Sequence, residues 1–157
     1  MANVEAPAPE LEFIFGAQVT VDPPQDLGAF NKGHRRVVPI TGGVFSGPVL
    51  RGTVLPGGAD WQLIRHDGVA ELDARYTLRT EDGAEIYVHN RALRHGPAEV
   101  MEALAAGRPV AADSYYFRGA ASFQTDAAHY AWLARHIIVC AAVREPSHVN
   151  LRFFKVL

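Results

Sequence analysis

Ionisable and aromatic side chains in the middle of the chain have the types and spacing for proton-transfer chemistry. Asp60 and Trp61 follow Gly57–Gly58 where a strand begins, so a carboxylate stands beside an indole. A carboxylate in a partly dry pocket has a raised pKa, which suits a general acid or base. Arg36, at the start of another apolar run, would hold Asp60 ionised or bind an anionic substrate. The alternative for Asp60 is structural, with its carboxylate capping the glycine turn.

Two further segments carry candidates for contacts with a ligand. Tyr76 alternates in phase with apolar residues, so its hydroxyl is expected to point toward a core or pocket, where it needs a partner. Tyr87, His89 and Arg91 share one face of the next segment, and aliphatic residues share the other. An exposed polar face is the preferred interpretation there, and an inward face is the alternative. Tyr116 poses the same question.

Trp132, in a short helical segment, is interpreted either as part of a lid or as core packing. The seven histidines form no compact metal-ligand spacing, and the glycine pairs match no phosphate-binding loop. We therefore expect neither a metal nor a cofactor. The predicted catalytic residues are Asp60, Tyr76 and Arg36, and the predicted substrate-binding residues are Trp61, Arg91, His89, Trp132 and Tyr116.

Short alternating segments separated by glycine and proline must position these side chains. Period-two alternation predicts strands over residues 11–21, 36–41, 49–55, 61–66, 69–80, 85–91, 115–125, 137–143 and 149–156. Short helices are predicted at 97–107 and 127–135, the second capped by Asp126. We predict an all-β, mainly antiparallel fold, a closed up-and-down barrel of about eight strands with one or two short helices. A two-sheet sandwich is the alternative.

Size and composition limit the classes of function. The 157 residues fit one β-barrel domain over 11–157, preceded by a flexible arm over 1–10. A net charge of −2 argues against binding nucleic acid, and no apolar run approaches the ~18 residues of a membrane span. The single Cys140 and a start without signal-peptide character favour a cytoplasmic protein. A homodimer is expected only because symmetric oligomers are common.

Several segments resemble the family known as domain of unknown function 3237, over about residues 13–156. The matching text is RVVPITGGVFSGPVLRGTVLPGG at 36–58, ADW at 59–61, RHDG at 65–68, LDARY at 72–76, EDGAEI at 81–86 and YAWL at 130–133. The resemblance implies a lipocalin-like or allene-oxide-cyclase-like barrel and little about activity. Where the family often has a glycine–arginine pair after the sixth strand, this chain has NRALR at 90–94, so either Arg91 or Arg94 faces the pocket.

Two functions from different classes fit these residues. The first is a cofactor-independent enzyme acting on a small carbonyl-bearing molecule inside the barrel, as an isomerase, cyclase or hydratase/lyase. Asp60 would move the proton, Arg36 would hold an oxyanion and Tyr76 would donate to an enolate. The alternative is a lipocalin-type small-molecule binding or carrier protein without catalysis; a scaffold for subunit contacts is a third. A strongly shifted pKa beside the pocket would favour the enzyme.

Overall fold

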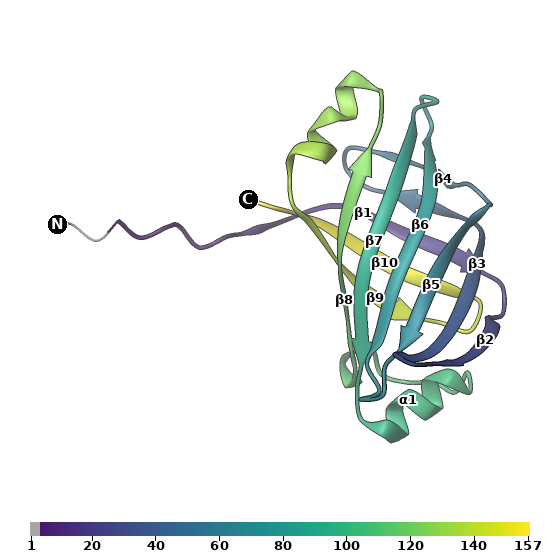
Figure 1. Ribbon diagram of the computed structural model, residues 1–157. Coiled ribbons are helices and arrows are strands. Elements are labelled where there is room, and N and C mark those ends of the chain that lie inside the picture. Colours follow the sequence, from purple (N-terminus) through teal and green to yellow (C-terminus); the bar gives the residue numbers. More distant parts are fainter. Residues whose placement is uncertain (1–3) are drawn as a thin grey trace.

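The computed structural model describes residues 4–157 (Figure 1). The strands are β1 (Leu11–Val21), β2 (Gln25–Phe30), β3 (Gly33–Ser46), β4 (Arg51–Val54), β5 (Gly58–Ile64), β6 (Ala70–Thr80), β7 (Glu85–His95), β8 (Tyr116–Gln124), β9 (Ile138–Arg144) and β10 (His148–Val156). The helical segments are the α-helix α1 (Ala98–Ala105) and the 3₁₀ segments η1 (Ala112–Ser114) and η2 (Ala128–Arg135).

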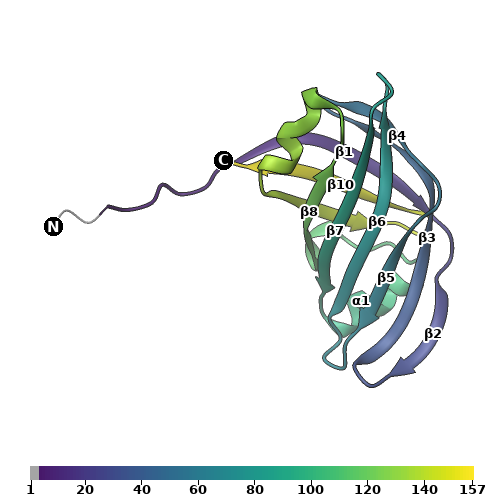
Figure 2. The ribbon, with the colours of Figure 1, turned by 45° about the horizontal axis from the view of Figure 1, so that its top comes forward.

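Antiparallel pairing closes the sheet into a barrel. The ring runs from β1 through β3, β5, β6, β7, β8, β9 and β10 back to β1. β4 lies between β3 and β6 beyond the end of β5, and β2 forms a hairpin with the first part of β3. The closed outline is visible from two directions (Figures 1 and 2). The predicted closed antiparallel barrel is confirmed, and the two-sheet alternative is wrong because β1 pairs with both β3 and β10.

The barrel interior has an apolar half and a polar half. Phe15, Phe45, Phe123 and Phe153 fill the end near η2, with centroids of Phe15 and Phe153 4.6 Å apart. Such aromatic contacts add about 0.5–1.5 kcal/mol each beyond burial of their area. Toward the other end, charged and amide side chains join Tyr76, Phe117 and aliphatic residues on the inward rows. The site is therefore confined to one end of the barrel.

Gly42–Gly43 do not end the second predicted strand as expected. β3 continues through them to Ser46, and both of its edges change partner there: one edge changes from β2 to β1, and the other changes from β5 to β4. A Cβ atom on Gly43 would lie 2.1 Å from the carbonyl oxygen of Gln18, and the residue has φ +137°. Glycine is required because β1 and β3 meet there to close the barrel.

The helical predictions are confirmed in part. α1 lies within the predicted 97–107 and covers one end of the barrel (Figure 1). The segment predicted as a helix at 127–135 is the 3₁₀ turn η2, and Asp126 does not cap it: the first flanking residue is Ala127, and no side-chain hydrogen bond caps η2. Instead the Asp82 carboxylate, in the β6–β7 turn, accepts hydrogen bonds from His129 at 2.7 Å and the Tyr130 hydroxyl at 3.3 Å.

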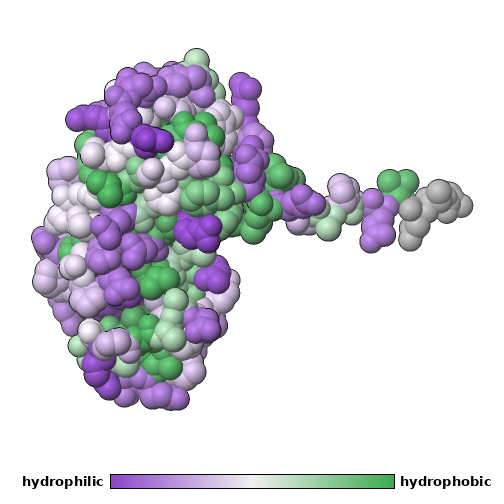
Figure 3. Space-filling view, turned by 180° about the vertical axis from the view of Figure 1, so that it is seen from behind, coloured by the Kyte–Doolittle hydropathy of each residue, from purple (hydrophilic) through white to green (hydrophobic). Residues whose placement is uncertain are grey.

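The segment before β1 leaves the barrel. Residues 4–10 have no regular secondary structure and extend away from the body (Figures 1 and 3). The first three residues of the predicted arm lie outside the described residues. On the face seen in Figure 3, hydrophobic and hydrophilic residues are interspersed over the barrel. Within residues 4–157, no helix has the length and hydropathy needed to cross a membrane.

Candidate functional site

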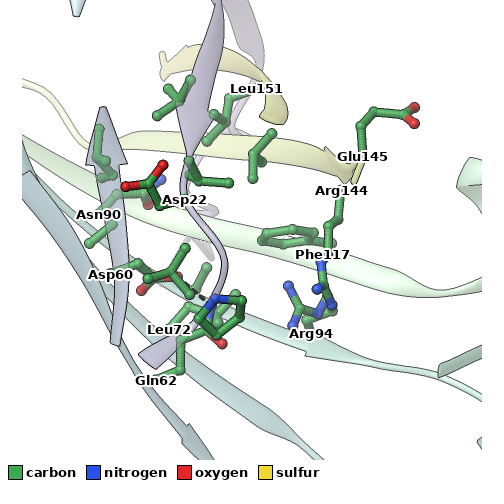
Figure 4. A pocket seen from close by; sticks show the side chains of 18 of the residues that line it. Asp22, Asp60, Gln62, Leu72, Asn90, Arg94, Phe117, Arg144, Glu145 and Leu151 are labelled. Carbon is green, nitrogen blue, oxygen red and sulfur yellow. Dashed lines mark hydrogen bonds between the residues drawn. The ribbon is translucent and has the colours of Figure 1, made fainter. Parts of the chain in front are cut away.

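A cavity of about 100 Å³ lies in the polar half of the barrel (Figure 4). Its rim includes Asp22–Pro24, between β1 and β2, and Glu145–Pro146, between β9 and β10. Apolar side chains such as Leu72 and Phe117 form part of the wall. Its polar wall consists of Arg36, Asp60, Gln62, Tyr76, Asn90, Arg94 and Arg144. A space of this size holds several water molecules or a compact organic group.

A hydrogen-bonded chain crosses β3, β5 and β6. Gln62 donates from Nε2 to Oδ2 of Asp60 at 2.7 Å, and its Oε1 accepts from Nε of Arg36 at 2.6 Å. The backbone N–H of Asp73 donates to Oδ1 of Asp60 at 2.9 Å. Because Arg36 pairs with Gln62, and Val38 with Asp60, the β3–β5 register sets this arrangement. Asp60 is thus held in one orientation by both of its oxygens.

The protonation of Asp60 is tuned by opposing effects. Burial raises the pKa of this carboxyl above its ordinary value, and the Gln62 amide, the charge of Arg94 and the Asp73 N–H partly offset the rise. Tyr76 lies on β6, two residues beyond Ala74, the residue paired with Asp60. Burial is the largest cause of the raised pKa of the Tyr76 phenol, which therefore stays protonated and able to donate a hydrogen bond. A base and a hydrogen-bond donor thus share one cavity.

Two further arginines extend into the cavity from neighbouring parts of the wall. Arg94 is at the end of β7 and Arg144 at the end of β9 (Figure 4). Burial and the charge of Arg144 are the two largest causes that lower the pKa of Arg94. Burial also lowers the pKa of Arg36 and of Arg144. The cavity therefore concentrates positive charge.

The structure brings the three predicted catalytic residues together. Asp60, Tyr76 and Arg36 come from three neighbouring strands and all line the cavity. Their positions agree with the predicted site, and their roles stay predictions. Of the two arginines that the sequence left open, Arg94 faces inward and Arg91 faces out.

Four predicted substrate-binding residues lie on the outer face of the barrel. Trp61, Arg91 and Tyr116 line a groove outside the wall, and Trp61 is 45 % exposed. His89 lies within 2.7 Å of the Asp73 carboxylate. Their prediction as contacts of a ligand inside the barrel is corrected. The reason is strand alternation, because the side chain after an inward residue must point outward.

Trp132 also lies away from the cavity. It belongs to η2 at the opposite, apolar end, where Nζ of Lys155 lies 5.4 Å from its ring centroid. It is half-buried and packs against the hydrophobic core, so the core alternative fits its position and the wall of the pocket does not.

Three cavity residues were missed by the sequence interpretation, Gln62, Asn90 and Arg144, and a fourth, Arg94, was named there only as the alternative to Arg91. Gln62, Asn90 and Arg94 are no more than 5 % exposed. Each of the four alternates in phase with inward residues of its own strand. Within residues 4–157, no group of three or more His, Cys, Asp or Glu side chains has an arrangement that could hold a metal ion.

Comparison with known proteins gives a consistent set of relatives. Residues 9–156 match the family "protein of unknown function (DUF3237)". A UPF0311 protein of Clostridium acetobutylicum is 43% identical over 146 residues, 92% of each chain. The crystal structure of a conserved protein of unknown function from Rhodopseudomonas palustris superposes with a TM-score of 0.92 at 36% identity, covering 97% of this chain and 100% of that one.

A more distant match has a name that states an activity. The hydroalkoxylation enzyme phnH of Penicillium herquei is 36% identical over 80 residues, 51% of this chain and 53% of that protein. A solved enzyme structure from the same organism has the same fold, with a TM-score of 0.74 at 23% identity over 99% of both chains.

Proposed function

The chain belongs to the DUF3237 family, and we propose that it is an enzyme that moves a proton on a small carbonyl-bearing molecule held inside the barrel, using its own side chains. The observation that carries the proposal is the setting of Asp60. Its pKa is raised by burial, its orientation is set by Gln62 and the Asp73 N–H, and it shares a cavity with a protonated phenol. A shifted carboxyl in a cavity is what proton transfer needs and a carrier does not.

Each polar group has a distinct task in this reaction. Ionised Asp60 removes a proton from the carbon beside the carbonyl; the electrons of that C–H bond form the enolate, whose negative charge is on oxygen. Tyr76 donates a hydrogen bond to that oxygen, and the cation of Arg36 stabilises its charge. Return of the proton to another carbon completes an isomerisation. In an elimination, the electrons of the enolate instead form the carbon–carbon double bond and break the C–O bond of a β-oxygen substituent, which takes the proton from Asp60 and leaves as water or an alcohol. The reverse sequence is an addition.

The name of a relative supports the addition and elimination class. Hydroalkoxylation is the addition of an alcohol across a carbon–carbon double bond, and phnH carries that name. An addition of this kind forms one C–O bond and one C–H bond, so it needs a group that delivers or removes a proton. We assign that task to Asp60 in this chain. A lipocalin-type carrier is the second candidate, because the cavity alone would suffice for binding.

Deuterium exchange separates the enzyme from the carrier. Small enolisable and α,β-unsaturated ketones that raise the Tm are incubated with the protein in D₂O and followed by ¹H NMR. An enzyme is expected to exchange the α-proton, or to add water or alcohol, faster than the buffer does. Ketones that bind but exchange only at the buffer rate would favour the carrier.

The pH dependence of this exchange should follow the ionisation of the Asp60 carboxyl. A base acts when it is ionised, so kcat/KM is expected to rise with pH through a midpoint above 3.8, the ordinary value for Asp, because burial raises the pKa. Gln62→Leu removes the amide that lowers this pKa, so its midpoint should move to higher pH. Gln124→Leu, an exposed change on β8, is the matched control and should leave the profile unchanged. A midpoint that Gln62→Leu leaves in place would contradict the role of Asp60.

A further inference from the structure

The cavity contains more positive than negative charge. Arg36, Arg94 and Arg144 line it, and Asp60 is the one carboxylate in its interior among residues 4–157. In the same part of the chain, none of the three arginines has a carboxylate within 4.0 Å. The two other acidic residues, Asp22 and Glu145, are exposed at the rim, and the Glu145 carboxylate points away from Arg94 and Arg144 (Figure 4).

Of these three arginines, Arg94 has the least to offset the cost of burying its charge. It is 4 % exposed, and its Nε is buried without a hydrogen-bond acceptor among the described residues. Its guanidinium carbon lies 5.3 Å from the centroid of the Phe117 ring, which attracts the cation but accepts no ordinary hydrogen bond. Burial and the charges of Arg144 and Arg36 lower the pKa of Arg94 to about 10, so the group remains a cation at neutral pH. A buried cation with a free donor is costly unless a partner arrives.

We propose that the substrate carries an ionised carboxylate, separate from its reacting carbonyl, and that Arg94 binds this carboxylate together with Arg144, while Arg36 stays at the Asp60 end. The inference rests on the proposed function for the reacting carbonyl, and it adds the class of molecule, a small keto acid or unsaturated acid. A carboxylate matches the planar fork of a guanidinium and would accept from the free Nε of Arg94. It would also reduce the repulsion among the three cations.

The strand register sets the distance between the two ends of such a molecule. Asp60 pairs with Ala74, which pairs with Asn90, so Asp60 is level with Asn90 on β7. Arg94 is four residues further along, and four residues span about 13 Å of strand. The arginine side chain occupies part of that distance. One compact molecule therefore reaches from the carboxylate site to the proton-transfer site.

The apolar wall indicates an organic acid and not an inorganic anion. Leu72, Phe117 and Leu151 surround the space between the charged groups. These side chains gain from contact with carbon, and they offer no hydrogen bond to a sulfate or phosphate ion. An organic anion uses both parts of the wall.

Matched ligand pairs test the carboxylate directly. Organic acids from acetate to naphthoate, including 4-oxopentanoate, are each compared with the primary amide of the same skeleton by thermal shift and by calorimetry. We expect the better acids to raise the Tm by about 5–10 °C at a hundredfold excess over Kd, and the amides to have little effect. Acids that bind no better than their amides would overturn the proposal. Sulfate or phosphate that binds as tightly as the best acid would overturn the organic class.

Arg94→Met and Arg144→Met are expected to weaken binding of the acids by about 10–100-fold, the usual loss for a hydrogen-bonded charge. Arg91→Met, on the outer face of the same strand, is the matched control and should bind normally. Without a bound acid, the Tm of Arg94→Met should be no lower than that of the parent protein, because the substitution removes an uncompensated buried cation. A lower Tm together with unchanged acid affinity would show a purely structural role and overturn the proposal.

The two proposals fail in different ways. Binding of the acids is measured without turnover, and Asp60→Asn should bind them at least as tightly because it removes a negative charge from the cavity. Acids held through Arg94 without any proton exchange would end the enzyme proposal and leave this inference standing. Proton exchange on neutral ketones, with no preference for acids, would do the reverse.

Discussion

Replacing Asp60 by asparagine is expected to lower the rate of α-proton exchange by about 10²–10⁴-fold, the usual contribution of a positioned general base. Asparagine has nearly the same shape and retains an oxygen that can accept from Gln62 or from the Asp73 N–H. It cannot take up a proton at neutral pH. The measurement is kcat for the bound ketone by ¹H NMR, with ligand affinity measured in parallel and expected to stay within about tenfold.

The Asp60→Asn variant should still fold, because the pKa of Asp60 is raised in the folded state. A carboxyl whose folded pKa is raised contributes its stability below the unfolded pKa and loses it as pH rises through the folded pKa. At neutral pH, well above the ordinary pKa of an Asp carboxyl, burying Asp60 therefore costs stability, and the neutral amide carries no such cost. Asp60→Asn should melt near the parent temperature. Unchanged turnover in a folded Asp60→Asn would exclude Asp60 as the base. Asp73→Asn, an outward carboxylate on β6, is the matched control.

The phase of each strand was the informative part of the sequence. Ile86, Val88 and Ala92 show which face of β7 points inward, and Asn90 and Arg94 are in phase with them. An arginine in phase with the apolar residues of a strand is expected inside, where it needs a partner or a ligand. The same rule places Arg144 in phase with Ile138, Cys140 and Ala142. Strand phase alone therefore predicts that Arg94 and Arg144 point into the barrel. It also predicts that Tyr87, His89 and Arg91 point outward.

Other features depend on the closed barrel and have no local signal. Arg36, Arg94 and Arg144 are far apart in sequence, and only the register of the paired strands brings them to one end of the interior. The length of β3 was underestimated because Gly42–Gly43 resemble a turn. Their role depends on the approach of β1, which no local pattern records. Likewise, the residues of β2 are mostly exposed, so no buried alternation marks the strand.

The aromatic half of the interior helps to offset the cost of burying charged side chains in the other half. A barrel of about eight strands is just wide enough for packed side chains or one small ligand. The buried arginines and Asp60 contribute desolvation costs at one end. The tightly packed aromatic end and the closed ring of hydrogen bonds must offset those costs, because native domains are stable by only about 5–15 kcal/mol.

Phe153→Ala tests that division and is expected to reduce the free energy of unfolding by about 3–5 kcal/mol, the usual loss for a buried phenylalanine. Phe153 is 0 % exposed and stacks on Phe15. Its neighbour Phe154 points outward and meets Phe13 at 5.8 Å, so Phe154→Ala is the matched control, with a loss of about 1 kcal/mol. Urea unfolding measures both variants.

The aromatic cluster is at the end away from the cavity. At urea concentrations too low to unfold the Phe153 variant, the pH midpoint of kcat/KM assigned to Asp60 should therefore be unchanged. Equal losses in the two variants would show that the aromatic end does not offset the cost of the charged one.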